Sequence, residues 1–555
     1  MRYLLVLLVL TSSALARPAE LVLTEGAVYT LDPAKPWARC VAIANGRIAY
    51  VGDDPAAWIG PDTRVERLPG RMVLPGLVDC HVHPVAGGVE LGQCSLYGLT
   101  TREELLSRVA AYAREHPEKA WIVGAGWLAP TFPDSNPQRQ DLDAVLPDRP
   151  CFLVAADGHS AWVNTAALRR AKLTAGTPDP VGGRIERDPS GEPSGTLRET
   201  ALGLIEPLLP EVTHEESVAG LHTALEMAAG FGITTMHEAR ATEKELKAYA
   251  ELDRQGQLTA RMVVALWVDP AKGVEQVDRL KGLRERYSSG LVAPRAAKLF
   301  ADGIIEGHTA ALLEPYLDTG ARGDLNFAPE AMADLVTRLD GEGFQVHVHA
   351  IGDRAVRVSL DSLAAARRAN GWRDTRPHLA HLEMIDPADY PRFRQLDVGA
   401  TFQPLWACQD DYITRLTLPV LGPERSSRLY PMGSLLRAGA RLAGGSDWTV
   451  SSLNPLEAIE VAVTRRASGE PPGDPWLPGE RLDLATAIDA YTREGAYRSF
   501  QDGGVLRQGA PADLVVLERN LFEIQPWEIG EVRVLLTLLE GREVFRAGRS
   551  SGPPP

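Results

Sequence analysis

Hydrophobic and polar residues alternate in short runs near both ends of the chain. Between residues 20 and 74 three β-prone runs are separated by glycine-containing turns: LVLTEGAVYTL, CVAIANGRIAYVG and RVERLPGRMVLPG. The same pattern of short β-prone runs returns near the C-terminus in PADLVVLERN and VRVLLTLLEGREVFRAG. We therefore predict a small β-sandwich domain built from both chain ends, residues 17–74 and 503–549.

The middle of the chain, residues 75–502, instead alternates β-like runs with helical ones. The β-like runs include ITTMHEA, RMVVALWV, AAKLFADG, FQVHVHAIGD, PHLAHLE, VGATFQP and RLAGGSD, and amphipathic stretches lie between them. Repeated strand–helix units predict an α/β fold whose parallel strands close into a (β/α)₈ barrel. One or two further β-like runs fall in a predicted insertion at about residues 87–211, which contains the hairpin-like GGRIERDPSGEPSGTL.

The first residues have the pattern of a secretory signal peptide. Arg2 is followed by a short apolar run, and the segment ends in an A-x-A cleavage pattern at Ala16. We predict that residues 1–16 are removed and that the protein is exported, to the periplasm or out of the cell. The apolar run is too short for a stable membrane anchor, and no other stretch of the sequence approaches spanning length.

Composition and charge narrow the choice of partners. The 555 residues are 45% hydrophobic and 24% charged, which is typical of a soluble globular protein. A formal net charge of −15 argues against nucleic acid or an anionic membrane surface as the partner. Five cysteines without a CxxC motif argue against a disulfide scaffold, although one disulfide between Cys80 and Cys94 stays open.

The segment RMVLPGLVDCHVHP contains the first candidate site residues. His81 and His83 lie two residues apart, and on a strand such residues point to the same face. Two imidazoles that converge at a strand end form half of a metal site. A single HxH is often accidental, so the prediction depends on what the rest of the chain adds.

Four more polar residues lie late in separate β-like runs. Lys298 stands among apolar residues in AAKLFADG, His349 ends FQVHVH, His381 ends PHLAH and Asp447 follows Gly-Gly-Ser. Carboxyl ends of barrel strands meet at one face, so these side chains are expected to converge with the first two histidines. His347 would lie deeper, as a packing residue or as a partner of a ligand.

These motifs resemble the metal-dependent amidohydrolase superfamily, whose first-strand signature is similar to LPGLVDCHVHP. More narrowly, DGHSAWVNTAAL, GEPSGTLRE, KLFADG, VHAIGDRAV, GGSDW and PADLVVL resemble the amidohydrolase-3 branch, which includes N-acyl-amino-acid deacylases and N-substituted formamide deformylase. The resemblance covers essentially the whole mature chain. It implies the same combination of barrel and sandwich that the alternation of elements predicts.

The resemblance also implies a ligand set. His81, His83 and Asp447 would hold one ion, His349 and His381 a second, and Lys298 would bridge them as a carbamate formed with carbon dioxide. Imidazole and carboxylate ligands suit Zn²⁺, while Mn, Fe, Co or Ni are alternatives. The alternative is a mononuclear site in which Lys298 is unmodified and one later histidine completes the set.

The function implied is hydrolysis of C–N bonds other than peptide bonds, in amides, N-acyl groups or formamides, by a metal-activated hydroxide. Asp447 would act as general base, and His381 or His237 would add hydrogen bonds to the substrate or the oxyanion. Deamination or ester hydrolysis at the same site is one alternative. An isomerase or lyase, or a binding protein on a degenerate barrel, are others, although no expected ligand is missing from this sequence.

Substrate recognition is assigned to residues near the expected barrel mouth. Those from the insertion are Trp127, Asp157 and His159, although core packing is the alternative for Trp127. Those from the barrel are His237, in a run expected to be the third strand, and Glu306 and His308, after KLFADG. The expected partner is a small amide-type molecule. Barrels of this kind commonly pair, so a homodimer is a further expectation, but the sequence identifies no interface.

Overall fold

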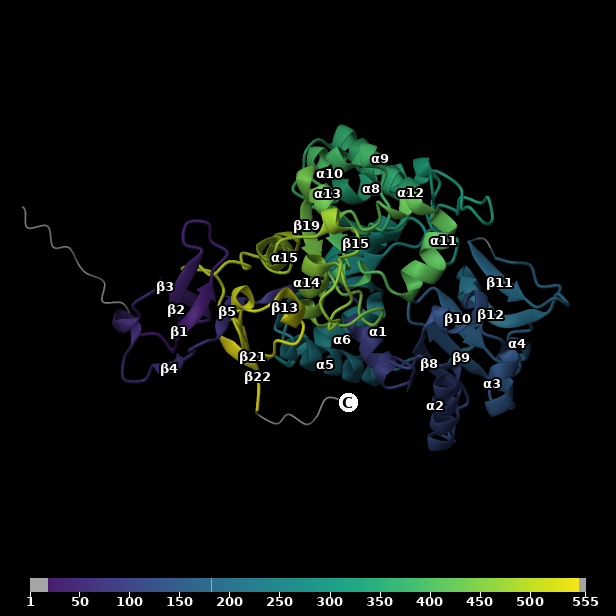
Figure 1. Cartoon of the computed structure of the whole chain (residues 1–555), viewed down its shortest axis with the longest axis horizontal. Coiled ribbons are helices and arrows are strands. Elements are labelled where there is room, and N and C mark those ends of the chain that lie inside the picture. The colour runs from purple at the N-terminus through teal and green to yellow at the C-terminus, as the bar shows by residue number, and fades with distance from the viewer. Residues whose placement is uncertain (1–17, 181, 549–555) are drawn as a thin grey trace, which may run out of the picture.

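The computed structural model describes residues 18–180 and 182–548, which form three sheets with their helices. In Figure 1 the sheet made by the chain ends lies on the left, a barrel in the centre and the inserted sheet on the right. The predicted signal peptide, residues 1–16, lies outside the described residues.

A parallel barrel of eight strands forms the centre of the molecule and confirms the predicted (β/α)₈ class. Its order is β6, β13, β14, β15, β16, β17, β18, β19, with bounds Leu77–Val82, Ile233–Ala241, Arg261–Trp267, Val292–Phe300, Gln345–Ala350, His378–His381, Gly399–Phe402 and Arg441–Gly444. Most strand residues are buried, because helices cover the outer face and side chains fill the inside.

Helices connect and cover the barrel strands. They include α1 (Pro84–Leu91), α5 (His214–Gly230), α6 (Glu243–Arg254), α7 (Gln276–Tyr287), α8 (Pro329–Gly341), α9 (Asp353–Asn370), α10 (Tyr390–Leu396), α13 (Met432–Arg437), α14 (Pro455–Thr464), α15 (Leu484–Ala490) and α16 (Arg493–Arg498). Local sequence sets several of their starts. Thr213 and Glu216 form a capping box at α5, and Thr242 and Glu245 form one at α6. A π-helix (Ile413–Thr417), α11 (Leu418–Leu421) and α12 (Pro423–Ser426) lie between β18 and α13.

The barrel closes where the loop after β19 meets β6. The backbone N–H of Asp447 donates to the carbonyl oxygen of His81 at 2.7 Å. The buried Asp79 carboxylate accepts from the N–H groups of both His81 and Ser446 at 3.0 Å. A Cβ at Gly445 would lie 2.7 Å from the His81 nitrogen, so this approach requires glycine.

The insertion lies between the first and second barrel strands and contributes no strand to the barrel. Its sheet has the order β11, β12, β10, β9, β8, β7, with bounds Gly183–Arg187, Pro193–Glu199, Ser160–Val163, Cys151–Ala155, Ile122–Trp127 and Cys94–Ser95. Helices α2 (Arg102–Glu115), α3 (Arg139–Val145) and α4 (Thr165–Arg170) accompany it. The expectation that His237 lies on the third barrel strand is therefore wrong, because β13 is the second.

The third sheet joins the two chain ends. Its order is β22, β21, β20, β5, β1, β2, β3, with bounds Arg542–Arg546, Val534–Leu539, Leu514–Leu517, Met72–Pro75, Leu21–Tyr29, Trp37–Ala44 and Arg47–Gly52, and β4 (Arg64–Arg67) pairs with β1. β5 and β20 pair antiparallel, so strands more than four hundred residues apart share one hydrophobic core. β5 then leads directly into β6, the first barrel strand.

Two further observations concern membranes and disulfides. Among the described residues, no helix combines the length and apolar character needed to cross a membrane. All five cysteines are buried and free, so the disulfide between Cys80 and Cys94 that the sequence left open is not formed.

A buried ion pair connects the barrel with the sheet formed by the chain ends. Arg261, at the start of β14, contacts Asp513 at 3.1 Å and Glu540 at 2.9 Å. Arg261 and Asp513 are both buried, and Asp513 directly precedes β20. Removing one partner of such a pair leaves the other charge buried without compensation.

We therefore predict that Arg261→Leu lowers the free energy of unfolding by about 3 kcal/mol. The double variant Arg261→Leu/Asp513→Asn should recover part of this loss, because it no longer buries a lone carboxylate. Denaturant unfolding of the two single variants and the double variant measures the coupling. Strictly additive effects would show that the pair does not join the two units.

Candidate metal centre

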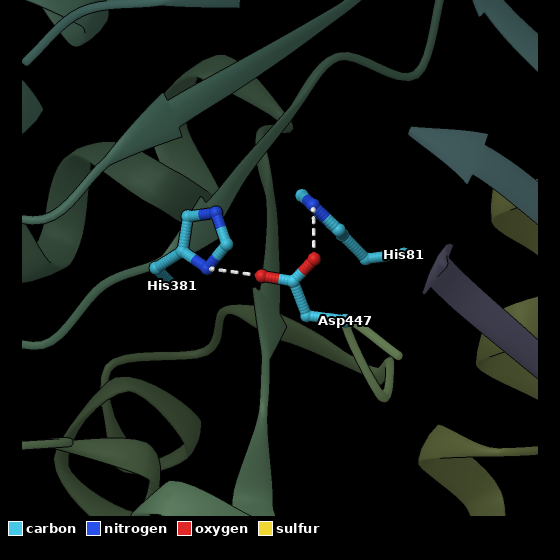
Figure 2. A group of neighbouring side chains, drawn as sticks. All are labelled: His81, His381 and Asp447. Carbon is cyan, nitrogen blue, oxygen red and sulfur yellow. Dashed lines mark ion pairs between the residues drawn. The ribbon is translucent and has the colours of Figure 1, made fainter. Parts of the chain in front are cut away.

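Three side chains from three barrel strand ends converge at the mouth of the barrel. His81, His381 and Asp447 each offer a ligand atom, and these atoms lie within 4.8 Å of one another. The His81 Nε2 lies 3.5 Å from one oxygen of Asp447, and the His381 Nδ1 lies 3.8 Å from the other. Figure 2 shows the two imidazoles on either side of the carboxylate.

His83 lies beside this group and contacts two carboxylates. Its Nε2 is 3.1 Å from Asp447, and its Nδ1 is 3.3 Å from Glu238. Burial alone would lower the pKa of His83, but the hydrogen bonds to both carboxylates raise it to about 9. Glu238 also accepts from the Tyr249 hydroxyl at 2.6 Å. Sequence reasoning missed Glu238, although it directly follows His237 in the run that forms β13.

Lys298 is fully buried, and its Nζ lies 3.4 Å from the His81 Nε2. Burial lowers the pKa of Lys298 to about 7, and the Asp447 carboxylate acts in the opposite direction. A large part of this amine is therefore neutral near pH 7. The sequence placed Lys298 in apolar company, and the structure adds its contact with the histidine group.

His349 lies next to His381, with ring centroids 4.4 Å apart. Its Nε2 is 3.2 Å from the carbonyl oxygen of Gly303, so it stands beside the three-donor group rather than in it. Asp302 holds this strand end in place, because its carboxylate accepts from the N–H groups of Ile351 and Gly352 at 3.1 and 2.9 Å. The sequence showed Asp302 within KLFADG, but not this contact.

A row of histidines continues into the barrel beneath the site. The His347 Nε2 lies 3.0 Å from the His81 Nδ1, so His347 orients His81 as the deeper partner that its position in the strand suggested. The His347 ring lies 4.0 Å from that of His378, which lies 5.8 Å from His237. The His237 Nε2 meets the Ser499 hydroxyl at 2.9 Å.

Two of the converging residues adopt left-handed backbone conformations, with φ of 76° at His381 and 52° at Asp447. Residues other than glycine adopt such conformations rarely, and they are enriched at functional sites where the surroundings impose them. Here His381 ends β17 and Asp447 follows β19, so the turns aim both side chains at the same point.

A cavity of about 660 Å³ opens above these residues. Its walls include His349, His381 and Asp447 from the centre, Asp157 and His159 from the insertion, and Glu306 from the loop after β15. The His159 Nδ1 lies 2.9 Å from Glu199. Burial would lower the pKa of His159, but Glu199 outweighs it and raises the value to about 9.

The other three residues expected to recognise substrate lie away from this cavity. Trp127 is buried in the core of the insertion, where its Nε1 donates to the carbonyl oxygen of Leu153 at 2.8 Å. His237 points into the barrel interior because alternate residues of a strand face opposite sides, and Glu238 takes the other side. The His308 Nε2 lies 2.8 Å from the Asp318 carboxylate.

The donor set fits a divalent metal ion. Burial holds the pKa of His81 and of His381 well below the usual histidine value, so both rings are neutral and their lone pairs are free to bind a cation. Among the described residues, the buried Nδ1 of His381 finds no hydrogen-bond partner, and a metal ligand bond would satisfy it. Imidazoles with a carboxylate are a common ligand combination for Zn²⁺ and similar ions.

A parallel barrel with histidine and carboxylate ligands at the carboxyl ends of its strands defines a class of metal-dependent enzymes. Comparison with known proteins specifies that class. A family model described as Amidohydrolase family (Amidohydro_3) matches residues 64–545. This chain therefore belongs to the metal-dependent amidohydrolase family.

Two curated relatives and one solved structure match most of the chain. Protein LONG AFTER FAR-RED 3 of Arabidopsis thaliana is 32% identical over 95% of this chain and 92% of its own. The N-substituted formamide deformylase of Arthrobacter pascens is 27% identical over 94% of this chain and 97% of its own. An uncharacterized metal-dependent hydrolase from Pyrococcus furiosus superposes with a TM-score of 0.70 at 26% identity, covering 90% of this chain and 99% of that one.

We predict that the purified protein contains a divalent metal and that His381→Ala lowers its metal content. The variant removes one of three converging donors, and the remaining pair should bind the ion much more weakly. Elemental analysis after dialysis measures the metal per chain. His222→Ala is the matched control, because His222 is an exposed residue on α5. Equal metal content in both variants would exclude His381 as a ligand.

Proposed function

We propose that this protein hydrolyses C–N bonds other than peptide bonds in small amides, N-acyl compounds or formamides. The observation that carries the proposal is the convergence of His81, His381 and Asp447, of which His381 and Asp447 line a cavity large enough for a small molecule. The family supports a hydrolase acting on C–N bonds. The relative from Arthrobacter pascens, named for N-substituted formamides, supports the choice of amides as substrates.

A bound divalent ion lowers the pKa of a coordinated water and polarises a carbonyl oxygen. His81, His83 and His381 would hold such an ion, with Asp447 among them. Asp447 is also the proposed general base: its carboxylate lies in the cavity wall, where it can take a proton from water and return it to the leaving nitrogen. His83 and His81 contact the same Asp447 oxygen and hold its orientation.

Lys298 is proposed to carry a carbamate. Its neutral amine can attack carbon dioxide, forming an N–C bond and releasing a proton, and the anionic product suits a site that gathers cations. Burial favours this reaction because it keeps much of the amine unprotonated near pH 7. A carbamate would add an oxygen ligand beside His81; in that bridged arrangement His81, His83 and Asp447 would hold one ion, and His349 and His381 the second, whereas in the mononuclear alternative His381 would join the first set. Zn²⁺ is the proposed metal, on the basis of the donor types.

Export is part of the same proposal. The A-x-A pattern that ends at Ala16 supports a cleaved signal peptide, and the substrate would then be met in the periplasm or outside the cell.

We predict that Asp447→Asn reduces turnover of an amide substrate by roughly 100- to 10,000-fold while the fold is kept. The amide is nearly isosteric with the carboxylate but is a far weaker base. The effect is measured as the rate of amine release from a panel of N-substituted formamides and N-acyl amines. Asp62→Asn, in an exposed part of the terminal domain, should behave as the unaltered protein. Near-normal turnover in Asp447→Asn would remove this residue as the base.

We predict that native mass spectrometry finds a mass increase equal to one carbon dioxide on Lys298. Lys298→Met should lose both this increase and part of the bound metal, because no bridging anion can form. Lys244→Met is the control, since Lys244 is exposed on α6. An unmodified lysine together with one metal equivalent per chain would favour the mononuclear site over the bridged pair.

A further inference from the structure

The cavity above the metal centre has carboxylates that the proposed chemistry does not use. Besides Asp447, its walls include Asp157, Glu306 and Glu383. Within the described chain, Arg415 is the only lysine or arginine that lines it, and Arg415 is largely exposed and faces Asp411 at 3.6 Å. The positive charge of His159 is already matched by Glu199. Acidic side chains therefore outnumber lysine and arginine side chains on these walls.

Glu383 is the most informative of these residues. Glu383 lies two residues after the end of β17 and is only 4% exposed. Among the described residues, its Oε2 atom is buried without a hydrogen-bond partner, although Glu383 lines the cavity. A buried carboxylate oxygen without a partner costs free energy, and a ligand that donates a hydrogen bond would remove this cost.

Glu306 adds to the same feature from the loop after β15. Its Oε1 accepts a hydrogen bond from the Thr417 hydroxyl, which fixes the side chain at the cavity wall. Glu306 and Glu383 therefore line the same cavity from two different loops. A ligand that carries both positive charge and N–H donors would match the pair.

Aromatic side chains complete the surroundings. Trp406 and Tyr430 line the cavity, and the Trp406 ring stacks on His381 at 5.3 Å with an interplanar angle of 3°. Aromatic faces attract cations, as carboxylates do, and they also bury the carbon atoms that carry a cationic group. These walls combine the two kinds of side chain that recognise organic cations.

We propose that Glu383 and Glu306 bind a cationic, N–H-bearing group of the substrate, namely an ammonium, amidinium or guanidinium. The inference rests on the proposed amide hydrolysis, because it specifies the substrate class for the same cavity. In the reaction, water adds to the carbonyl carbon, the C–N bond breaks, and the products are a carboxylic acid and an amine. The cationic group itself takes no part in bond breaking. Amides that carry an ammonium group are favoured, and N-acyl amino acids, which carry a carboxylate, are disfavoured.

A binding experiment tests the site independently of turnover. Benzylguanidinium and benzylurea are nearly isosteric, but only the first is charged. Calorimetric titration of the metal-loaded protein should show that benzylguanidinium binds roughly tenfold or more tightly, as expected for a charge-assisted hydrogen bond. Glu383→Gln and Glu306→Gln should each reduce this preference. Glu424→Gln should keep it, because Glu424 is an exposed residue on α12.

Thermal unfolding and metal analysis of each variant separate loss of the site from loss of the fold. If Glu383→Gln fails to fold, Glu306→Gln still tests the inference, because Glu306 is less deeply buried. Equal binding of the two probes by the unaltered protein, or an unchanged preference in a folded Glu306→Gln variant, would overturn it.

A kinetic experiment separates this inference from the proposed function. N-formylcadaverine, N-formylhexylamine and N-formyl-δ-aminovalerate carry an ammonium, a neutral and a carboxylate end on similar chains. The ratio kcat/KM should fall in that order. If all three compounds are hydrolysed and kcat/KM for N-formyl-δ-aminovalerate equals or exceeds that for N-formylcadaverine, the cation site is overturned and the proposed function stands. Binding of benzylguanidinium without hydrolysis of any amide would keep the site and overturn the function.

Discussion

The contact between the first and last barrel strands is the constraint on which the metal centre depends. A backbone hydrogen bond from Asp447 to His81, and the two bonds accepted by Asp79, hold together segments that lie far apart in sequence. Gly445 makes this approach sterically possible. The same contact that closes the barrel therefore sets the distance between the His81 imidazole and the Asp447 carboxylate.

Burial determines the protonation states around this contact. It favours neutral His81, neutral His381 and a partly neutral Lys298, all of which could otherwise compete with a metal cation as positive charges. His83 differs because Glu238 and Asp447 favour its charged form, so a metal bound there would displace a proton. His81 and His381 are thus neutral before a metal binds, whereas His83 would have to lose a proton when it binds one.

The sequence predicted the barrel class and the residues at the centre, because strand periodicity and strand ends are local features. His81, His381, Asp447 and Lys298 each end or follow a β-like run, and parallel strands bring such ends together. Partners that depend on side-chain direction were not predictable. Glu238 and His237 are adjacent, and only the pairing of β13 decides which one faces the centre. Trp127 lies in the insertion core, the alternative that the sequence left open, and His308 contacts Asp318.

The insertion and the loop between β18 and α13 supply much of the cavity wall, while the barrel strands supply the metal donors. Much of the cavity wall and the candidate metal donors thus come from different parts of the chain, as is common in barrels of this kind.

The closing contact also has a consequence for how the molecule is made. Because Asp447 must reach His81 before either can share an ion, a nascent chain has no complete centre until nearly all of it has been synthesised. Contacts of such large sequence separation form late, since the entropy of closing a long loop must be overcome first. Metal acquisition then becomes a marker of a finished barrel: premature termination yields a chain that carries the histidines of the first strand but cannot complete the centre.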